Sequence, residues 1–344
     1  MSLERGLMTG FLVDRPSPEA WPAAGVPWRI APLREHEVPA VSHLTFPACR
    51  TLLAGCQSRG ESDQNHAVRA LVAWSGTEPV GLVLAQIRDD DRAEKPSSTS
   101  AQLFSVSVLP AWRQRGLARA LVQAMEKVLR QAGCTSVEVD YTTRLPALVP
   151  FERLLLSCRW APPEATLLMS LGNCHDVIKA PWIGAVRDVP PGFELFEWAQ
   201  LSADERACLD HAVAVGEIPK NLSPFADEEA IEPGISVGVR RHGEVVAWMT
   251  VTRSPFMPDA LCYRSTYVRP QWRAARALGP LVLSEALRRH VASPVREARP
   301  VGAFGMSFKE SVKMLNFYRK RLAPYCFSSY ESRCAVRRLD EPLS

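Results

Sequence analysis

Apolar and polar residues follow the same pattern in both halves of the chain. A run in which about every second side chain is apolar, 102–108 in the first half and 261–268 in the second, precedes a stretch with apolar residues at spacings of three and four, 117–129 and 277–290. A spacing of two is typical of strands, and spacings of three and four are typical of helices. Each half therefore predicts a strand followed directly by a helix.

The junction between strand and helix also carries the same residues twice. The pattern Val-x-Pro-x-Trp-Arg occurs at 108–113 and again, 160 positions later, at 268–273. A predicted hairpin precedes each copy, and a strand, a short helix and a last strand follow it. Similar elements in the same order indicate an internal duplication.

The duplication sets the expected domains. The segment 172–192 holds three prolines and no clear periodicity, which is typical of a linker. We expect an N-terminal domain over 1–175, a linker over 176–190 and a C-terminal domain over 191–344. Each domain is predicted as β–α–β–β–β–α–β–α–β, so the expected fold class is α/β (α+β), with two units that each contain a mixed, mainly antiparallel sheet flanked by helices.

Composition narrows the class of protein without naming a function. The 344 residues carry 41 basic and 37 acidic side chains, a net charge of +4, which is too balanced for a protein that neutralises many phosphates of a nucleic acid. No apolar run is long enough to cross a membrane, so we expect a cytoplasmic protein. Cysteines and histidines show no metal-ligand spacing, and no metal is expected.

The turn at 113–118 carries the clearest candidate chemistry. It begins the predicted helix, where the first backbone N–H groups lack helical partners and the helix dipole adds partial positive charge. Gly116 and Ala118 are small, which lets a phosphate group approach the backbone, and neighbouring arginines add positive charge. The turn therefore predicts an anion-binding site, and a solvated basic helix start is the alternative.

The strand, the Val-x-Pro, the Arg-x-x-Gly-x-Ala turn and the helix together resemble motif A of the GNAT superfamily of acyl-CoA N-acyltransferases. The resemblance implies that the turn holds the pyrophosphate of acetyl-CoA or another acyl-CoA, and that the preceding strand pairs with the pantetheine arm. The residues that it assigns to this co-substrate are Val106, Val108, Arg113, Gln114, Arg115, Gly116, Leu117, Ala118 and Arg119. Because the order of elements recurs, the chain resembles a tandem GNAT protein with two GNAT-like units.

The second copy of the turn departs from this pattern. Aligned without a gap, Arg276 falls at the position of Gly116, where its side chain would fill the space that a pyrophosphate needs. A three-residue insertion restores a glycine, Gly279, at this position. We expect a degenerate second unit that shapes the acceptor pocket, and a second acyl-CoA site is the alternative.

Candidate catalytic residues lie in different halves. The resemblance implies that a tyrosine early in the last helix of a unit protonates the leaving thiolate, and Tyr318 stands there in the second half, whereas the first half has Phe151. Glu138 and Asp140 are two apart on a predicted strand, share one face and are candidates for the base in the first half. Packing of Tyr318 and a surface position for the two carboxylates are the alternatives. Tyr318 acting across the domain interface, or chemistry in the second unit, also stays open.

The sequence thus predicts an acyl-CoA-dependent N-acyltransferase that acylates a small amine, an amino acid or a natural-product intermediate by direct transfer from the thioester. Two alternatives stay open: a non-catalytic protein that senses acyl-CoA, and a transferase that uses a carrier-protein thioester or aminoacyl-tRNA. The expected partner is a small-molecule amine, with no nucleic acid and no membrane. Monomer and homodimer are equally compatible with the sequence.

Overall fold

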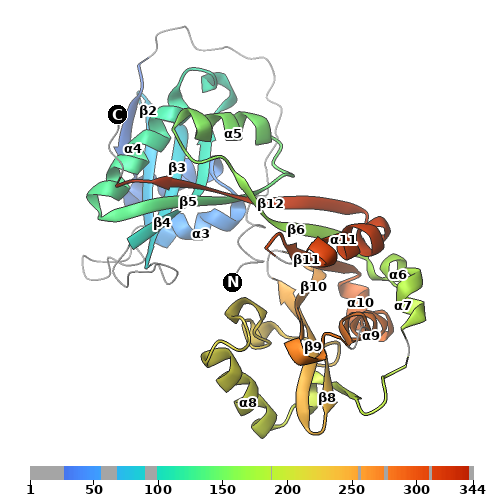
Figure 1. Ribbon diagram of the computed structural model, residues 1–344. Coiled ribbons are helices and arrows are strands. Elements are labelled where there is room, and N and C mark those ends of the chain that lie inside the picture. The colour runs from blue at the N-terminus through green and yellow to red at the C-terminus, as the bar shows by residue number, and fades with distance from the viewer. Residues whose placement is uncertain are drawn as a thin grey trace. The chain divides into compact units, whose positions relative to one another are not determined.

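The structure, a computed structural model, describes residues 27–55, 68–89, 99–186, 188–254, 257–274, 278–309 and 312–340. These residues form two compact units (Figure 1). The N-terminal unit holds the described residues up to Ala165 and those from Ser332 onward, and the C-terminal unit holds Thr166–Glu331. No helix among the described residues is long and apolar enough to span a membrane.

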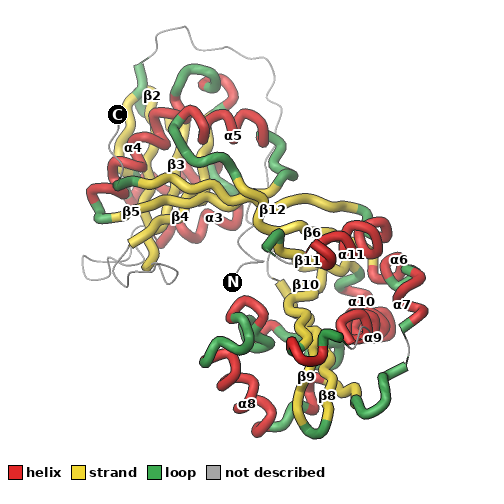
Figure 2. The backbone as a smooth tube through the Cα atoms, in the orientation of Figure 1, coloured by secondary structure: helices red, strands yellow, loops and turns green. Residues whose placement is uncertain are grey.

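The N-terminal unit is built on a sheet with the strand order β1-β2-β3-β4-β5-β12 (Figure 2). Its strands are β1 (Arg29–Pro32), β2 (Val68–Ser75), β3 (Glu78–Asp89), β4 (Thr99–Val108), β5 (Cys134–Thr142) and the later part of β12 (Ser328–Arg338). Its helices are α2 (Val38–Val41), α3 (Pro47–Gly55), α4 (Leu117–Gln131) and α5 (Leu148–Ser157). Among the described residues of this sheet only β4 and β5 pair in parallel, so the predicted mixed, mainly antiparallel sheet is confirmed.

Helices cover both faces of this sheet. The apolar stripe of α4, with Leu121, Met125 and Leu129 at spacings of four, is fully buried in one core cluster. Burying each of these side chains contributes roughly 1.5–3 kcal/mol, which explains why the pattern at 117–129 forms a helix packed on a sheet. Val41 and Leu53 of α2 and α3 belong to a second cluster with alternate residues of β2 and β3.

The C-terminal unit repeats this plan with the strand order β6-β11-β10-β9-β8-β7. Its strands are β6 (Glu164–Asn173), β7 (Glu194–Glu197), β8 (Val237–Arg241), β9 (Glu244–Ser254), β10 (Met257–Val268) and β11 (Val301–Ser307). Its helices are α6 (Cys174–Val177), α7 (Pro181–Ala185), α8 (Ala203–Ala214), α9 (Leu278–Ala292), α10 (Val295–Ala298) and α11 (Val312–Phe317), and a π-helical turn, Tyr318–Leu322, follows α11.

The two halves of the chain exchange their last strands. Residues 167–173 of β6, which end the first half, pair antiparallel with 301–307 of β11 in the C-terminal unit. Residues 332–338 of β12, which end the second half, pair antiparallel with 136–142 of β5 in the N-terminal unit. The units therefore differ from the expected division, because each takes its last strand from the other half of the sequence.

The segment expected as a linker, 176–190, forms part of the C-terminal unit instead. Ile183 of α7 is buried, and Trp182 donates its indole N–H to the Arg321 carbonyl at 2.8 Å. Arg288 of α9 donates to the carbonyl of Ile183 at 3.0 Å. Proline does not interrupt this segment, because Pro181 begins α7 and the first position of a helix needs no N–H donor.

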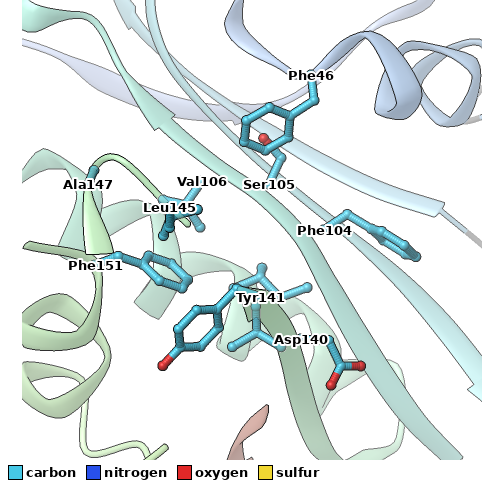
Figure 3. A pocket seen from close by; sticks show the side chains of 11 residues that line it. Phe46, Phe104, Ser105, Val106, Asp140, Tyr141, Leu145, Ala147 and Phe151 are labelled. Carbon is cyan, nitrogen blue, oxygen red and sulfur yellow. The ribbon is translucent and has the colours of Figure 1, made fainter. Parts of the chain in front are cut away.

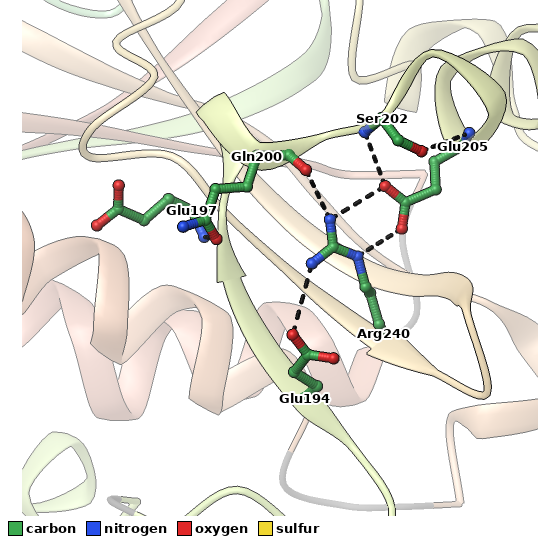
Figure 4. A network of polar contacts seen from close by, with 6 residues as sticks. All are labelled: Glu194, Glu197, Gln200, Ser202, Glu205 and Arg240. Atoms are coloured by element: carbon green, nitrogen blue, oxygen red, sulfur yellow. Dashed lines mark hydrogen bonds and ion pairs between the residues drawn. The ribbon is translucent and has the colours of Figure 1, made fainter.

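Arg240 of β8 anchors the start of α8 (Figure 4). Its guanidinium group donates to both carboxylate oxygens of Glu205, at 2.5 and 3.0 Å, and to the Gln200 carbonyl at 2.7 Å. It also lies 3.7 Å from the centre of the Phe196 ring and forms an ion pair with Glu194 at 3.6 Å. Figure 4 thus shows a structural network that fixes α8 against the sheet.

Candidate active site

The turn before α4 has an open backbone that suits an anion. Gly116, the N-cap residue, has φ +77° and Gln114 has φ +61°, so the turn adopts left-handed conformations that glycine takes without strain. The first hydrogen bond of the helix runs from the Ala120 N–H to the Gly116 carbonyl, at 3.0 Å. The N–H groups of 117–119 therefore have no acceptor within the helix. A Cβ atom added at Gly116 would meet no atom within 4 Å, so the approach to the turn is free of protein atoms.

The arginines of this turn are held by contacts of their own. Arg113 donates Nε–H to the Val108 carbonyl at 3.0 Å, and the Arg115 guanidinium lies 5.5 Å from the centre of the Trp112 ring. Arg119 donates to the Ser157 carbonyl at 2.6 Å, at the end of α5. Each contact uses only part of a guanidinium group that has five N–H donors. Their binding of an anion stays a prediction.

The two central strands separate next to the turn. β4 and β5 pair in parallel only from Thr99 to Gln102 on β4, although β4 continues to Val108. Val106 and Val108 pair with β3 on one side, and the β4–β5 pairing has already ended on the other. A bulge at Phe104, where the register between β3 and β4 shifts, marks the point of separation. This open edge fits the pantetheine arm that the resemblance assigns to Val106 and Val108.

A small cleft, open to solvent, lies at this separation (Figure 3). β4, β5 and the start of α5 form its walls, and Phe46 approaches from the segment before α3. The residues that line it are Phe46, Leu103, Phe104, Ser105, Val106, Val139, Asp140, Tyr141, Leu145, Ala147 and Phe151. The lining is apolar and aromatic, with one carboxylate.

The structure separates the two carboxylates that the sequence grouped together. Asp140 lines the cleft, and its Oδ2 accepts a hydrogen bond of 3.1 Å from the Gln102 side chain. Glu138 stands opposite Gln102 in the paired part of the two strands and does not line the cleft. A carboxylate inside a largely apolar cleft can bind an ammonium group and accept its proton. Asp140 is therefore the candidate base that the geometry supports.

Tyr141 is a cleft residue that the sequence did not single out. Its ring packs edge-on against Phe151, with ring centres 5.1 Å apart, and its hydroxyl donates to Glu152 Oε1 at 2.9 Å. Arg333 of β12 donates to the same oxygen, also at 2.9 Å. Burial and the neighbouring carboxylate raise the pKa of Tyr141 well above its ordinary value, so the hydroxyl stays protonated. In the sequence, only its place directly after the candidate base Asp140 could have indicated that Tyr141 lies at the site.

Tyr318 lies in the core of the C-terminal unit. Its side chain is only 2% exposed, and its hydroxyl donates to the Phe304 carbonyl at 2.5 Å. Burial raises its pKa far above the ordinary value for tyrosine. Tyr318 does not line the cleft of the N-terminal unit. This environment matches the packing alternative, because the hydroxyl is already engaged with the backbone.

The C-terminal unit repeats the geometry of the site with other side chains. β10 and β11 pair in parallel only as far as Tyr263, and β10 has a bulge at Arg264, the repeat position of Phe104. Arg264 forms an ion pair of 2.5 Å with Asp227. Arg276, which the sequence placed opposite Gly116, lies outside the described residues.

Comparisons with known proteins agree with this geometry. Residues 34–151 match the family model described as acetyltransferase (GNAT) family. The tandem GNAT protein from the clavulanic acid biosynthesis pathway, solved without AcCoA, matches with a TM-score of 0.59 and 16% identity over 92% of this chain and all of that one. The glucosamine N-acetyltransferase region of a fungal multi-domain β-N-acetylglucosaminidase matches with a TM-score of 0.57 and 13% identity, over 91% of this chain and 38% of that one. A search of curated proteins gives no significant match.

The first half of the chain is thus similar to the GNAT family over residues 34–151, and the whole chain has the fold of a tandem GNAT protein. The predicted resemblance and the predicted tandem arrangement are both confirmed.

Proposed function

We propose that the N-terminal unit transfers an acyl group from acyl-CoA, with acetyl-CoA as the expected donor, to the amine of a small molecule in the β4–β5 cleft. One observation carries the proposal. The cleft lies beside β4, the Gly116 turn follows the end of β4, and the edge of β4 toward β5 is unpaired over 103–108. A ligand with a diphosphate at one end and a thioester at the other suits such a path.

The chemistry follows from these residues. N–H groups at the start of α4 bind the pyrophosphate, and the unpaired edge of β4 pairs with the pantetheine amides. Asp140 accepts a proton from the bound ammonium group, which leaves a neutral amine able to attack the thioester carbonyl. As the C–N bond forms and the C–S bond breaks, the second amine proton passes to the leaving thiolate, so CoA leaves as the thiol.

A non-catalytic acyl-CoA sensor is the second candidate. It is favoured by Phe151, which lines the cleft at the start of α5 and has no hydroxyl to protonate the thiolate. Binding of acyl-CoA without turnover would distinguish a sensor from a transferase.

The test combines binding and turnover on the full chain. We expect calorimetry to detect CoA binding, and thiol release from acetyl-CoA to rise when amines are added. Gly116→Glu should abolish both, because a carboxylate at the turn repels and displaces the pyrophosphate. CoA binding without amine-dependent thiol release would favour the sensor, and normal CoA binding by Gly116→Glu would refute the assigned site.

A further inference from the structure

The bulge on β10 repeats the bulge on β4, but other side chains occupy it. Phe104 and Ser105 line the cleft of the N-terminal unit (Figure 3), and Arg264 and Ser265 stand 160 positions later in the C-terminal unit. Each pair lies where the register with the preceding strand shifts, so the backbone has the same irregularity in both units. The units differ in what lies over this bulge.

A segment of the chain itself, 217–227, covers the bulge of β10. The Ser265 hydroxyl donates to the Leu222 carbonyl at 2.7 Å, and the Tyr267 hydroxyl donates to the Glu217 carbonyl at 3.3 Å. Ser265 is only 1% exposed. The hydroxyl groups of β10 at this place are therefore already bonded to the covering segment.

Apolar side chains fix the covering segment to the sheet. Ile218 is fully buried, and Leu222 and Phe225 pack against the same core cluster, which contains Trp248 of β9 and Tyr267 of β10. Opening the segment would expose this apolar surface to water, which is unfavourable. The covering segment thus belongs to the core of its unit.

An ion pair holds the end of the covering segment at the bulge. Arg264 Nε donates to Asp227 Oδ2 at 2.5 Å, and only 7% and 15% of the two side chains are exposed. Arg264 Nη1 also lies 3.5 Å from the Asn221 carbonyl. Because the two charges already neutralise each other, neither is available to a ligand.

The N-terminal unit has different surroundings at the same position. Phe104 carries no charge of its own, although the Arg88 guanidinium lies 5.2 Å from the centre of its ring. The Ser105 hydroxyl is buried without a hydrogen-bond partner among the described residues. Both residues line a cleft that is open to solvent. One unit therefore has a cleft beside its bulge where the other has its own chain.

We propose that the C-terminal unit has no acceptor site, because the covering segment occupies the position beside β10 that corresponds to the cleft. If acyl transfer takes place in the β4 cleft, as proposed, the chain has a single site of transfer. CoA bound elsewhere in the C-terminal unit would then meet no amine there.

Hydrogen exchange followed by mass spectrometry tests this closure without turnover. Peptides that contain the hydrogen-bonded amides of Ile218 and Leu222 should exchange slowly. Addition of CoA with phenylethylamine, glucosamine or glycine should leave their rates unchanged. Exchange as fast as that of an unfolded chain, or slower exchange when an amine is added, would overturn the inference.

A variant of the ion pair extends this test. Asp227→Ala should speed the exchange of 217–227 by about tenfold or more, because Arg264 loses its partner. Glu229→Ala removes an exposed carboxylate two positions later and should have no such effect. Equal exchange rates in the two variants would contradict the role of the ion pair in the closure.

Turnover supplies an independent test on the full chain. Gly116→Glu should abolish thiol release with all three amines, and Asp227→Ala should leave turnover per folded molecule unchanged. If Gly116→Glu lowers the number of CoA molecules bound per chain and thiol release persists, the C-terminal unit holds an acceptor site and the inference is wrong. No thiol release by the unmodified protein would instead overturn the proposed function, and the exchange experiment would still decide whether the C-terminal unit is closed.

Discussion

Arg333 and Glu152 are 181 positions apart in the sequence, and their side chains meet at 2.9 Å. Arg333 lies on the exchanged strand β12, and Glu152 lies on α5. Glu152 also accepts a hydrogen bond from the hydroxyl of the cleft residue Tyr141. The second half of the sequence therefore supports the wall of the candidate site in the first.

Replacement of Arg333 by alanine should destabilise the N-terminal unit. The ion pair is partly buried, with 31% of the Arg333 and 22% of the Glu152 side chain exposed, so its loss should cost about 1 kcal/mol. Chemical denaturation measures this cost, and Arg333→Lys should recover part of it because a lysine keeps the charge but not the planar geometry. Arg338→Ala, at an exposed position of the same strand, is the control, and an equal loss there would contradict the role of Arg333.

Two glycines separate backbone strain from ligand binding. Gly116 and Gly133 have φ +77° and +84°, and a Cβ atom on either would meet no atom within 4 Å. An alanine at either position should therefore cost a similar amount of stability, about 1 kcal/mol. Only Gly116→Ala should weaken CoA binding in calorimetry, because only its methyl group faces the turn. Equal CoA affinities of the two variants would argue against a pyrophosphate at Gly116.

Tyr318→Phe tests the alternative assignment of the catalytic acid. Because the Tyr318 hydroxyl donates to the Phe304 carbonyl in a buried environment, its removal should lower the free energy of unfolding by about 1 kcal/mol. Turnover per folded molecule should not change. If turnover falls while thermal unfolding is unaffected, Tyr318 takes part in the reaction after all.

His290 predicts a loss of stability in mild acid. It is fully buried between the Tyr263 hydroxyl, 3.1 Å from Nδ1, and the Arg299 carbonyl, 2.8 Å from Nε2, and burial lowers its pKa. As the pH falls below about 6.5, the unfolded chain binds a proton that the folded protein does not bind until its own lower pKa is reached. The free energy of unfolding should therefore decrease in this window.

Denaturation curves between pH 7.5 and pH 5, roughly the range around the ordinary pKa of histidine, measure this effect. His290→Gln cannot titrate and should show a smaller slope with pH, although its stability is lower at every pH. A slope equal to that of the unmodified protein would assign the acid sensitivity to other groups.

Much of this architecture could be predicted from local sequence. Gly116 needs a left-handed turn, and the apolar spacing from Leu117 to Leu129 defines a helix, so the turn and the element order follow from neighbouring residues. Strand partners do not follow in this way, because backbone hydrogen bonds carry no side-chain identity. β6 and β12 both have the pattern of a last strand, and nothing in either one selects β5 or β11.

For the candidate site as well, local sequence predicts which residues share a face but not which of them reach the cleft. Periodicity of two places Glu138 and Asp140 on one face of β5, but only the end of the β4–β5 pairing at Gln102 leaves Asp140 in the cleft and Glu138 outside it. β4 and β10 have bulges at Phe104 and Arg264, and no local sequence pattern predicts them. A contact between residues as distant as Glu152 and Arg333 is a property of the fold alone.

The exchange of strands also sets an order of events during synthesis. Residues 332–338 cover one edge of β5 in the structure, and the ribosome makes them after the whole first half of the chain. Until they are made, these residues cannot pair with β5. An open strand edge is a template for pairing with any other strand, including one from a second copy of the chain. The N-terminal unit of the structure is therefore complete only when residues 332–338 have been made, and a cut between the two halves of the sequence would remove the last strand of each unit.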